Sequence, residues 1–125
     1  MKQVLSVEQM LHLKELGLDT SDGSMCFEWN ESDSDNMVVT SPDADTNYDY
    51  YHETYTLQDI LNKLPCFIGN QVLIIKKFVD SYTCLYMEPY TRSIIKITES
   101  KEPIDAAYEM LCWCIENGYI KVENE

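Results

Sequence analysis

Apolar residues near the start of the chain recur at helical spacing and form one broad face. The face begins after Ser6 and stops at Gly17, and Ser6 followed by Gln9 has the spacing of a capping box, in which two side chains bind the free N–H groups of the first turn. Glycine commonly follows the last turn of a helix. The pattern therefore predicts a helix over residues 7–16.

In the next two runs, the pattern of apolar residues is that of strands rather than of a helix. Residues 24–29 (SMCFEW) and 36–41 (NMVVTS) are rich in β-forming residues and flank the polar stretch NESDSD, which predicts a hairpin with an acidic tip. Three apolar side chains of the first run should share one face of the strand: Met25, Phe27 and Trp29. Residues 42–55 have no clear period, and we expect a loop or an irregular, tyrosine-rich sheet edge there.

A short helix and three strands are predicted in the next part of the chain. Thr56 can cap the helix LQDILNKL, and Pro65 ends it because proline disfavours the helical conformation at the preceding residue. Three β-rich runs follow the turn at Gly69 and Asn70: QVLIIKKFV, YTCLYME and RSIIKIT. The breaks between them are short and polar, which predicts an antiparallel meander.

Helical spacing returns toward the end of the sequence. Ser100 and Pro103 open this helix, which runs to about Asn117 and ends at Gly118. The predicted order is therefore α-β-β-α-β-β-β-α, with no internal repeat and no low-complexity linker.

These elements predict an α+β fold: an antiparallel sheet, formed by a hairpin plus a three-strand meander, with two or three helices packed on one face. The 125 residues fit a single domain, 1–125, because a chain of this length buries enough surface to fold unaided. Within this domain, an acidic loop-rich segment spans about residues 30–55.

Charge is unevenly distributed along the chain. Residues 15–62 contain no lysine or arginine and hold -12 of the formal net charge of -13. Twelve carboxylates carry it: Glu15, Asp19, Asp22, Glu28, Glu31, Asp33, Asp35, Asp43, Asp45, Asp49, Glu53 and Asp59. Direct binding to DNA or RNA is disfavoured, because affinity for phosphates rests on cationic contacts. A basic protein or a divalent cation is the partner that this composition favours.

The composition predicts a cytoplasmic protein that does not enter a membrane. Glu8 interrupts the opening MKQVLSVEQM before an apolar run of signal-peptide length, and no stretch approaches the ~20 apolar residues of a membrane span. The cysteines are odd in number and scattered, so we expect reduced thiols that pack as small hydrophobes. They are Cys26, Cys66, Cys84, Cys112 and Cys114.

The motif CWC is the most obvious sign of metal or redox chemistry. On a helix, residues two apart point about 200° away from each other, so Cys112 and Cys114 cannot bind one ion or form a disulfide. We expect Cys114 to lie in the core and Cys112 to lie at its boundary, beside the polar stripe of the helix. No cofactor is expected.

The stretch DADTNYDYYHE, residues 43–53, resembles part of a calcium-binding loop, because two aspartates and an asparagine occupy the first three ligand positions. However, Tyr48 takes the place of the required glycine, and the glutamate falls one residue before the closing ligand position. The candidate ligands are Asp43, Asp45, Asn47 and Glu53. A divalent-cation site is therefore an alternative to a plain solvated loop.

Enzymatic motifs are absent from the sequence. It contains no Ser-His-Asp or Cys-His set, no glycine-rich phosphate loop and no CxxC pair. Asp43 and Asp45 resemble the aspartate pair of phosphoryl-transferring hydrolases, but Pro42 interrupts the strand that should precede such a pair. His12 is expected at the surface, and His52 has no partner at motif spacing. A small hydrolase with a site assembled by the fold is a third, less favoured alternative.

Tyrosines in the acidic segment resemble an interaction surface, because tyrosine offers a large contact area at low entropic cost: Tyr48, Tyr50, Tyr51 and Tyr55. Alternatively, they only cover the edge of a sheet. The leading hypothesis is a non-enzymatic interaction protein whose acidic segment docks on a basic protein partner, in its sharpest form as a phosphate mimic toward a nucleic-acid-binding protein. The candidate contact residues are Asp43, Asp45, Asp49, Tyr48, Tyr50, Tyr51 and Glu53. An exposed edge strand also leaves a homodimer open.

Three stretches carry a resemblance to other proteins: VLSVEQMLHLKELGLDTSDGSM, TLQDILNKLP and IDAAYEMLCWCIENGYI. They resemble a group of small uncharacterised proteins from gut Bacteroides-type bacteria and their phages or mobile elements. The likeness covers about half of the chain and leaves out its acidic middle. The resemblance implies a cytosolic accessory protein of a prophage or mobile element, and it assigns no catalytic residue.

Overall fold

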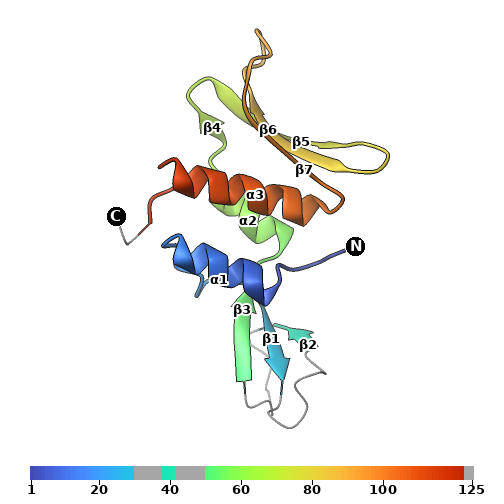
Figure 1. The fold of residues 1–125 in the computed structure, drawn as a ribbon, viewed down its shortest axis with the longest axis vertical. Helices are drawn as coiled ribbons and strands as arrows, with labels where there is room; N and C mark the ends of the chain where they lie inside the picture. The colour runs from blue at the N-terminus through green and yellow to red at the C-terminus, as the bar shows by residue number, and fades with distance from the viewer. Residues whose placement is uncertain (30–37, 42–49, 123–125) are drawn as a thin grey trace.

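The computed structural model describes residues 1–29, 38–41 and 50–122. Within these residues, the chain forms three helices and two antiparallel sheets (Figure 1). The elements are α1 (Val7–Glu15), β1 (Met25–Trp29), β2 (Val38–Thr40), β3 (Tyr50–Thr54), α2 (Leu57–Lys63), β4 (Phe67–Ile68), β5 (Gln71–Lys77), β6 (Tyr82–Met87), β7 (Ile94–Ser100) and α3 (Pro103–Glu116). The predicted α+β class with antiparallel pairing is confirmed.

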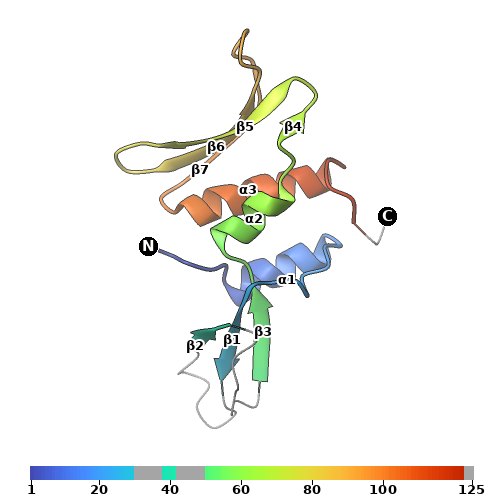
Figure 2. The same cartoon turned by 180° about the vertical axis from the view of Figure 1, so that it is seen from behind.

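The helices lie between the two sheets. A four-stranded sheet, of order β4-β5-β6-β7, forms one end of the molecule, and a three-stranded sheet, of order β2-β1-β3, forms the other (Figures 1 and 2). The predicted hairpin and the predicted meander thus belong to separate sheets, each of which has one extra strand. The molecule consequently has two distant ends with different compositions.

Local sequence signals account for the boundaries of the first two helices. Ser6 and Gln9 form the predicted capping box at the start of α1, and Gly17 has a φ of 101°, a backbone conformation that favours glycine. Thr56 caps α2, where Asp59 completes a second capping box. The helix α2 ends at Leu64, whose backbone is extended as required before proline.

The three-stranded sheet contains a strand that the sequence pattern did not resolve. β1 pairs with β2 on one side and with β3 on the other, and both pairings are antiparallel. β3 covers the last part of the stretch for which we expected a loop or an irregular edge. It is an edge strand of five residues, which agrees with the second of these alternatives.

The inner face of the four-stranded sheet packs on α3 and carries much of the core. Cys84 and Tyr86 of β6 point into this core and are almost fully buried, together with Met110 and Leu111 of α3. The Tyr86 hydroxyl donates a hydrogen bond of 2.7 Å to the carbonyl of Pro65, so its burial leaves no polar group unpaired. α3 is therefore covered by the sheet along one side.

The other side of α3 faces α1, and this second contact corrects one prediction. The ring of Tyr108 lies edge-on to His12 of α1, with ring centroids 6.4 Å apart. Cys112, one turn further along α3, is only 7% exposed and belongs to the core, whereas we expected it at the core boundary. Because the sheet, α1 and α2 all pack on α3, its polar stripe is narrower than the sequence indicates.

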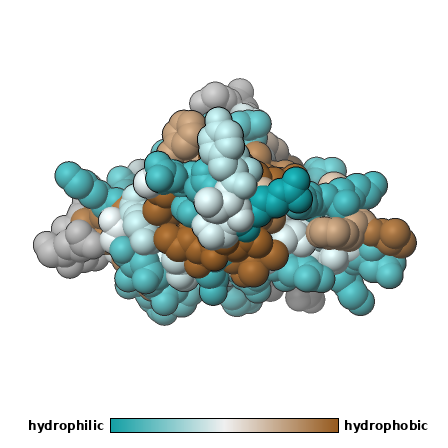
Figure 3. All heavy atoms as spheres, turned by 90° about the horizontal axis from the view of Figure 1, so that it is seen from above, coloured by the Kyte–Doolittle hydropathy of each residue, from teal (hydrophilic) through white to brown (hydrophobic). Residues whose placement is uncertain are grey.

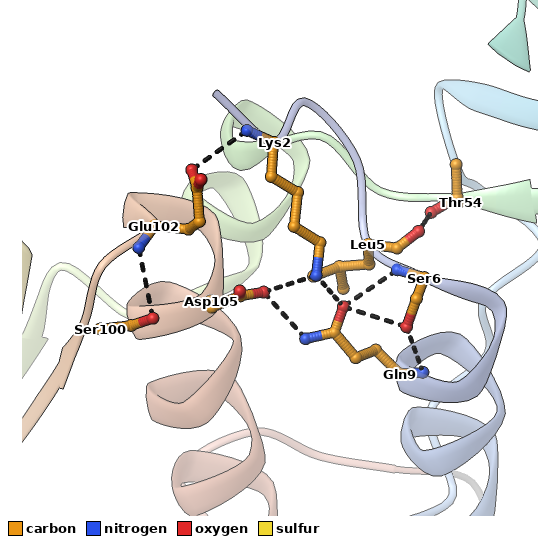
Figure 4. Close-up of polar contacts among 8 residues, drawn as sticks. All are labelled: Lys2, Leu5, Ser6, Gln9, Thr54, Ser100, Glu102 and Asp105. Carbon is orange, nitrogen blue, oxygen red and sulfur yellow. Dashed lines mark hydrogen bonds and ion pairs between the residues drawn. The ribbon is translucent and has the colours of Figure 1, made fainter.

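A polar network joins the N-terminal segment to α1 and α3 (Figure 4). The ammonium of Lys2 donates to the side-chain oxygen of Gln9 at 2.7 Å and to the carboxylate of Asp105 at 2.8 Å. Gln9 also donates to Asp105 at 2.9 Å. The backbone N–H of Lys2 donates to Glu102, just before α3. Side chains far apart in the sequence thus hold the two helices in register.

This network makes stability depend on pH. Burial raises the pKa of Asp105, but the hydrogen bonds from Gln9 and Lys2 outweigh it, so the pKa lies below its ordinary value of 3.8. A carboxylate with a lowered pKa stabilises the fold above its unfolded pKa, and this contribution is lost as the pH falls through the folded pKa. The network therefore stabilises the protein at neutral pH and fails in acid.

Asp105→Asn is expected to lower the melting temperature at pH 7 and to have progressively less effect as the pH falls below about 4, the unfolded pKa, and through the still lower pKa of the native carboxyl. Lys2→Met should shift the acid-induced loss of stability to higher pH, because it removes one of the interactions that lower the pKa of Asp105. Melting curves recorded from pH 3 to 7 test both expectations. Curves that stay parallel to the wild-type curve at every pH would rule out this role of Asp105.

Candidate interaction surfaces

The outer face of the four-stranded sheet is apolar and faces away from the helices. Strand pairing places one set of side chains on this face: Val72, Ile74, Leu85, Met87, Ile94 and Ile97. Among the described elements, all three helices lie on the opposite side of the sheet (Figures 1 and 2). Figure 3 looks down on this end of the molecule and shows hydrophobic side chains gathered near the centre, with hydrophilic ones around them. We call this surface the outer face.

The centre of the outer face is better covered than its flanks. Leu85 of the central strand β6 is only 2% exposed, although it lies opposite the helix-facing core. Its cross-strand neighbours are Ile74 on β5 and Ile97 on β7, and Ile97 is 52% exposed. The isoleucines on the flanking strand β7 thus shield the central leucine but stay in contact with solvent themselves.

A hairpin tip stands at one end of the outer face. Residues 88–93 connect β6 to β7, and Tyr90 at this tip is 93% exposed. An open groove of about 600 Å³ lies at the foot of the tip, lined by Val72, Ile74, Lys76, Met87, Pro89, Arg92 and Ile94. A second hollow of about 530 Å³ shares Val72 and Pro89 with it and extends toward Phe67. Most of the side chains that line the first groove are apolar, and Lys76 and Arg92 also line it.

The sequence contained a signal for this face that the strand prediction did not use. The run VLII in β5 and the pair of isoleucines before Lys96 in β7 are continuously apolar, which is typical of strands with apolar residues on both faces. Alternation with polar residues would have indicated a solvated outer face. Sequence reasoning assigned the three long strands of this sheet but neither the short strand β4 nor the second apolar surface.

The three-stranded sheet has the second candidate surface. Along β1, Cys26 and Glu28 are buried, at 1% and 4% exposure, whereas Met25, Phe27 and Trp29 are half-buried. The three apolar residues therefore share one face, as predicted. Phe27 lies opposite Val39 and His52 on the neighbouring strands, and Val39 is 42% exposed. An aromatic surface in contact with solvent is thus built into the acidic part of the chain.

Some of the acidic residues are structural. Asp22 accepts hydrogen bonds from the ammonium of Lys63 and from the hydroxyl of Tyr55. Burial raises the pKa of Asp22, but these hydrogen bonds outweigh it, so the pKa is lower than normal. Asp59 accepts from the backbone of Thr56 and from Ser24, and so ties α2 to the start of β1. These carboxylates are engaged inside the fold and are poor candidates for docking.

The structure describes only some of the residues that were predicted to contact a partner or bind a cation. Five of the predicted residues lie outside the described residues: Asp43, Asp45, Asn47, Tyr48 and Asp49. Tyr50, Tyr51 and Glu53 belong to β3, where they lie opposite Trp29, Glu28 and Cys26 in the strand pairing. The Nδ1 atom of His52 lies 2.8 Å from the carbonyl oxygen of Glu53. The docking segment and the cation loop remain predictions.

Tyr55 corrects the expectation that all four tyrosines line a surface. It is fully buried, and its hydroxyl donates to Asp22 at 2.8 Å and to the backbone carbonyl of Asp19 at 3.2 Å. The Lys63 ammonium lies 5.2 Å from the centroid of its ring. Tyr55 is therefore a core residue that joins the three-stranded sheet to the helices, and it cannot contact a partner.

The thiols of the CWC motif are packed in the core and unreactive. Burial raises the pKa of Cys112 and of Cys114 to about 11, so both are thiols at neutral pH, whereas metal ligands must be thiolates. All five cysteines are free, and only Cys66 is exposed. In the described part of the chain, no group of three or more histidine, cysteine, aspartate or glutamate side chains is arranged to hold a metal ion.

Comparison with known proteins adds no relative. No protein family, no curated protein and no solved structure matches this chain. None of the helices in the described ranges is long and apolar enough to span a bilayer. Function must therefore be argued from the surfaces themselves.

Proposed function

We propose that this chain is a non-enzymatic interaction protein whose acidic end docks on a basic protein partner. The observation that carries the proposal is the coincidence of charge and aromatic surface at one end of the molecule. The three-stranded sheet lies wholly within residues 15–62, which hold -12 of the net charge of -13. The same sheet carries the half-buried side chains of Phe27 and Trp29.

Each of these features supplies a different part of binding. A concentrated negative charge attracts a cationic partner over a distance and raises the association rate. Aromatic side chains such as Trp29 supply the contact area that slows dissociation, and they are enriched at protein interfaces. A phosphate-mimicking role against a nucleic-acid-binding protein is the most specific version, because such a protein already has a cationic surface for a polyanion.

The sequence resemblance supplies a biological context for this proposal. We propose that the chain acts in the cytoplasm as an accessory protein of a prophage or mobile element, where the partner is a basic protein of the host or of the element. The fold is compatible with this role because the described three-stranded sheet lies at the end of the molecule away from the four-stranded sheet (Figure 1).

A labelled arginine-rich peptide is a direct probe of the acidic end. The triple variant Asp43→Asn, Asp45→Asn, Asp49→Asn should bind this peptide about tenfold more weakly and with a shallower salt dependence, measured by fluorescence anisotropy. Trp29→Ser should weaken binding without changing the salt dependence, because it removes contact area and no charge. Unchanged affinity and salt dependence in the triple variant would rule out docking through this segment.

The matched control removes the same number of charges elsewhere. Asp80→Asn, Glu109→Gln, Glu116→Gln neutralises three exposed carboxylates outside residues 15–62. A loss of affinity equal to that of the first triple variant would mean that net charge alone attracts the peptide. Cation binding by the 43–53 loop is tested separately: it predicts a saturable rise of the melting temperature with calcium, whereas a polyanion responds alike to calcium, magnesium and sodium salts at matched ionic strength.

A further inference from the structure

The outer face of the four-stranded sheet exposes more apolar surface than is usual for a sheet face in contact with solvent. Ile94 and Ile97 are 48% and 52% exposed; Ile94 lines the groove, and Ile97 lies beside the buried Leu85. Soluble monomers rarely expose contiguous apolar patches of more than a few hundred Å², and larger ones mark interaction sites. No described helix or strand covers this face.

The strand register arranges the outer face in rows that run across the sheet. One row consists of Ile74, Leu85 and Ile97, from β5 through β6 to β7. The next row, further from the hairpin tip, consists of Lys76, Thr83 and Glu99. The second row has a cation at one edge of the sheet and an anion at the other, with a buried threonine between them. Two strand spacings, about 9–10 Å, separate the two charges.

Among the described residues, neither charge has an ion-pair partner. Lys76 and Glu99 are both exposed, and neither forms an ion pair with another described residue. By contrast, Lys2 and Lys63 are engaged by Asp105 and Asp22. The row of Lys76 and Glu99 therefore presents a cation and an anion on the same apolar face, neither of them paired by a residue that the structure describes.

We infer that the outer face is an interface between two copies of this chain, packed face to face as a β-sandwich about a two-fold axis parallel to the strands. Such a rotation exchanges the two edges of the sheet but keeps each row at its own level. Lys76 of each copy then lies opposite Glu99 of the other, Ile74 lies opposite Ile97, and Leu85 lies opposite Leu85. The row is self-complementary, which a two-fold interface requires.

Charge complementarity favours a second copy over an unrelated partner. A partner for this face must place an anion opposite β5 and a cation opposite β7, next to an apolar row, and the same face turned by 180° has this pattern. In a β-sandwich, aligned sheets pack about 10 Å apart, with their strand directions at roughly −30° to each other. In the proposed dimer, the two rows distant from the hairpin tip form the contact. The hairpin tips of both copies lie at the other end of this contact.

The strong negative charge of the chain does not oppose this association. The three-stranded sheet, which carries Glu28 and Glu53, lies at the end of the molecule opposite the outer face (Figure 1). In the proposed dimer, the two three-stranded sheets point in opposite directions, with the helices and the four-stranded sheets of both copies between them. Their repulsion is screened, because the Debye length is only about 8 Å at physiological ionic strength.

Charge-reversal variants of the full chain test this interface. Wild-type protein should sediment as a dimer in the micromolar range, and Lys76→Glu and Glu99→Lys should each weaken the dimer about tenfold or more, because each creates two like-charge pairs. An equimolar mixture of the two variants should form a heterodimer, in which both pairs are again of opposite charge. Sedimentation velocity of each variant and of the mixture measures these states.

The matched control is Lys77→Glu, which makes the same charge change on the same strand but on the opposite face of the sheet. It should leave the dimer intact. Because all three positions are exposed, the variants should fold, and circular dichroism checks this. A wild-type protein that is monomeric at roughly 100 μM would overturn the proposal. A mixture of the two variants that stays monomeric would also overturn it. So would a Lys77→Glu variant that dissociates as Lys76→Glu does, because that result would point to a different interface or to a different binding partner.

Discussion

Replacing Tyr55 by alanine is expected to lower the free energy of unfolding by about 3–5 kcal/mol, the range for truncation of a buried aromatic residue. The side chain is fully buried at the point where β3 leads into α2. Its removal opens a cavity there and leaves the carboxylate of Asp22 without one of its two side-chain donors. Chemical denaturation followed by circular dichroism measures the loss.

Tyr55→Phe separates the packing contribution from the hydrogen bond. It keeps the ring and removes the hydroxyl, so we expect a loss of about 1 kcal/mol at neutral pH. Because Tyr55 is one of the donors that lower the pKa of Asp22, that pKa should rise, and the acid-induced loss of stability should begin at higher pH. If the phenylalanine variant loses as much stability as the alanine variant, packing is not the main contribution of Tyr55.

Replacing Gly23 by alanine is expected to cost about 3 kcal/mol, the upper part of the range for overpacking. A methyl group at this position would lie 2.6 Å from the carbonyl oxygen and 2.9 Å from the nitrogen of Thr54. These are backbone atoms of β3, and they are held in place because Thr54 pairs with Met25 and its hydroxyl donates to the carbonyl of Leu5. The clash cannot be relieved by a change of rotamer.

Gly69→Ala is the control for this variant. Gly69 has a φ of 60°, but a methyl group there would meet no atom within 4 Å. It should cost only about 1 kcal/mol, from backbone strain alone. Urea denaturation of both variants compares the two costs. Equal losses would show that the close approach of Gly23 to β3 does not restrict the side chain. Because Gly23 precedes β1, its variant also tests how firmly the acidic sheet is anchored to the helices.

The two proposals together describe a bivalent molecule. A dimer formed through the outer face presents two acidic ends, each on its own three-stranded sheet. A partner or assembly with two basic sites would then bind more tightly than a single acidic end allows, since the second contact becomes intramolecular. Variants that break the dimer should therefore weaken binding to a tethered pair of arginine-rich peptides while leaving binding to one peptide unchanged.

Elements that depend on neighbouring residues were predictable from the sequence. The capping box at Ser6 and Gln9, the end of α2 before Pro65, and the glycine-closed end of α3 at Gly118 all follow from interactions within a few residues. The antiparallel meander followed from short breaks between β-rich runs. These signals are local, so the rest of the fold does not need to be known to interpret them.

Features that depend on contacts between distant segments were decided by the tertiary structure alone. Cys112 lies in the core rather than at its boundary because α1 covers the second side of α3. Tyr55 is buried because Asp22 and Lys63, distant in sequence, meet its hydroxyl and ring. The periodicity of one segment records how many of its faces are apolar, but not what covers them.

The same limit applies to the candidate surfaces. The sequence by itself determined the α+β class, the uneven charge and the shared face of Met25, Phe27 and Trp29. Only the tertiary structure decided that the hairpin and the meander form separate sheets at opposite ends, and that Lys76 and Glu99 share one row across three strands. Strand register brings residues of different strands side by side, and register is set by pairing between segments, which no single stretch of sequence contains.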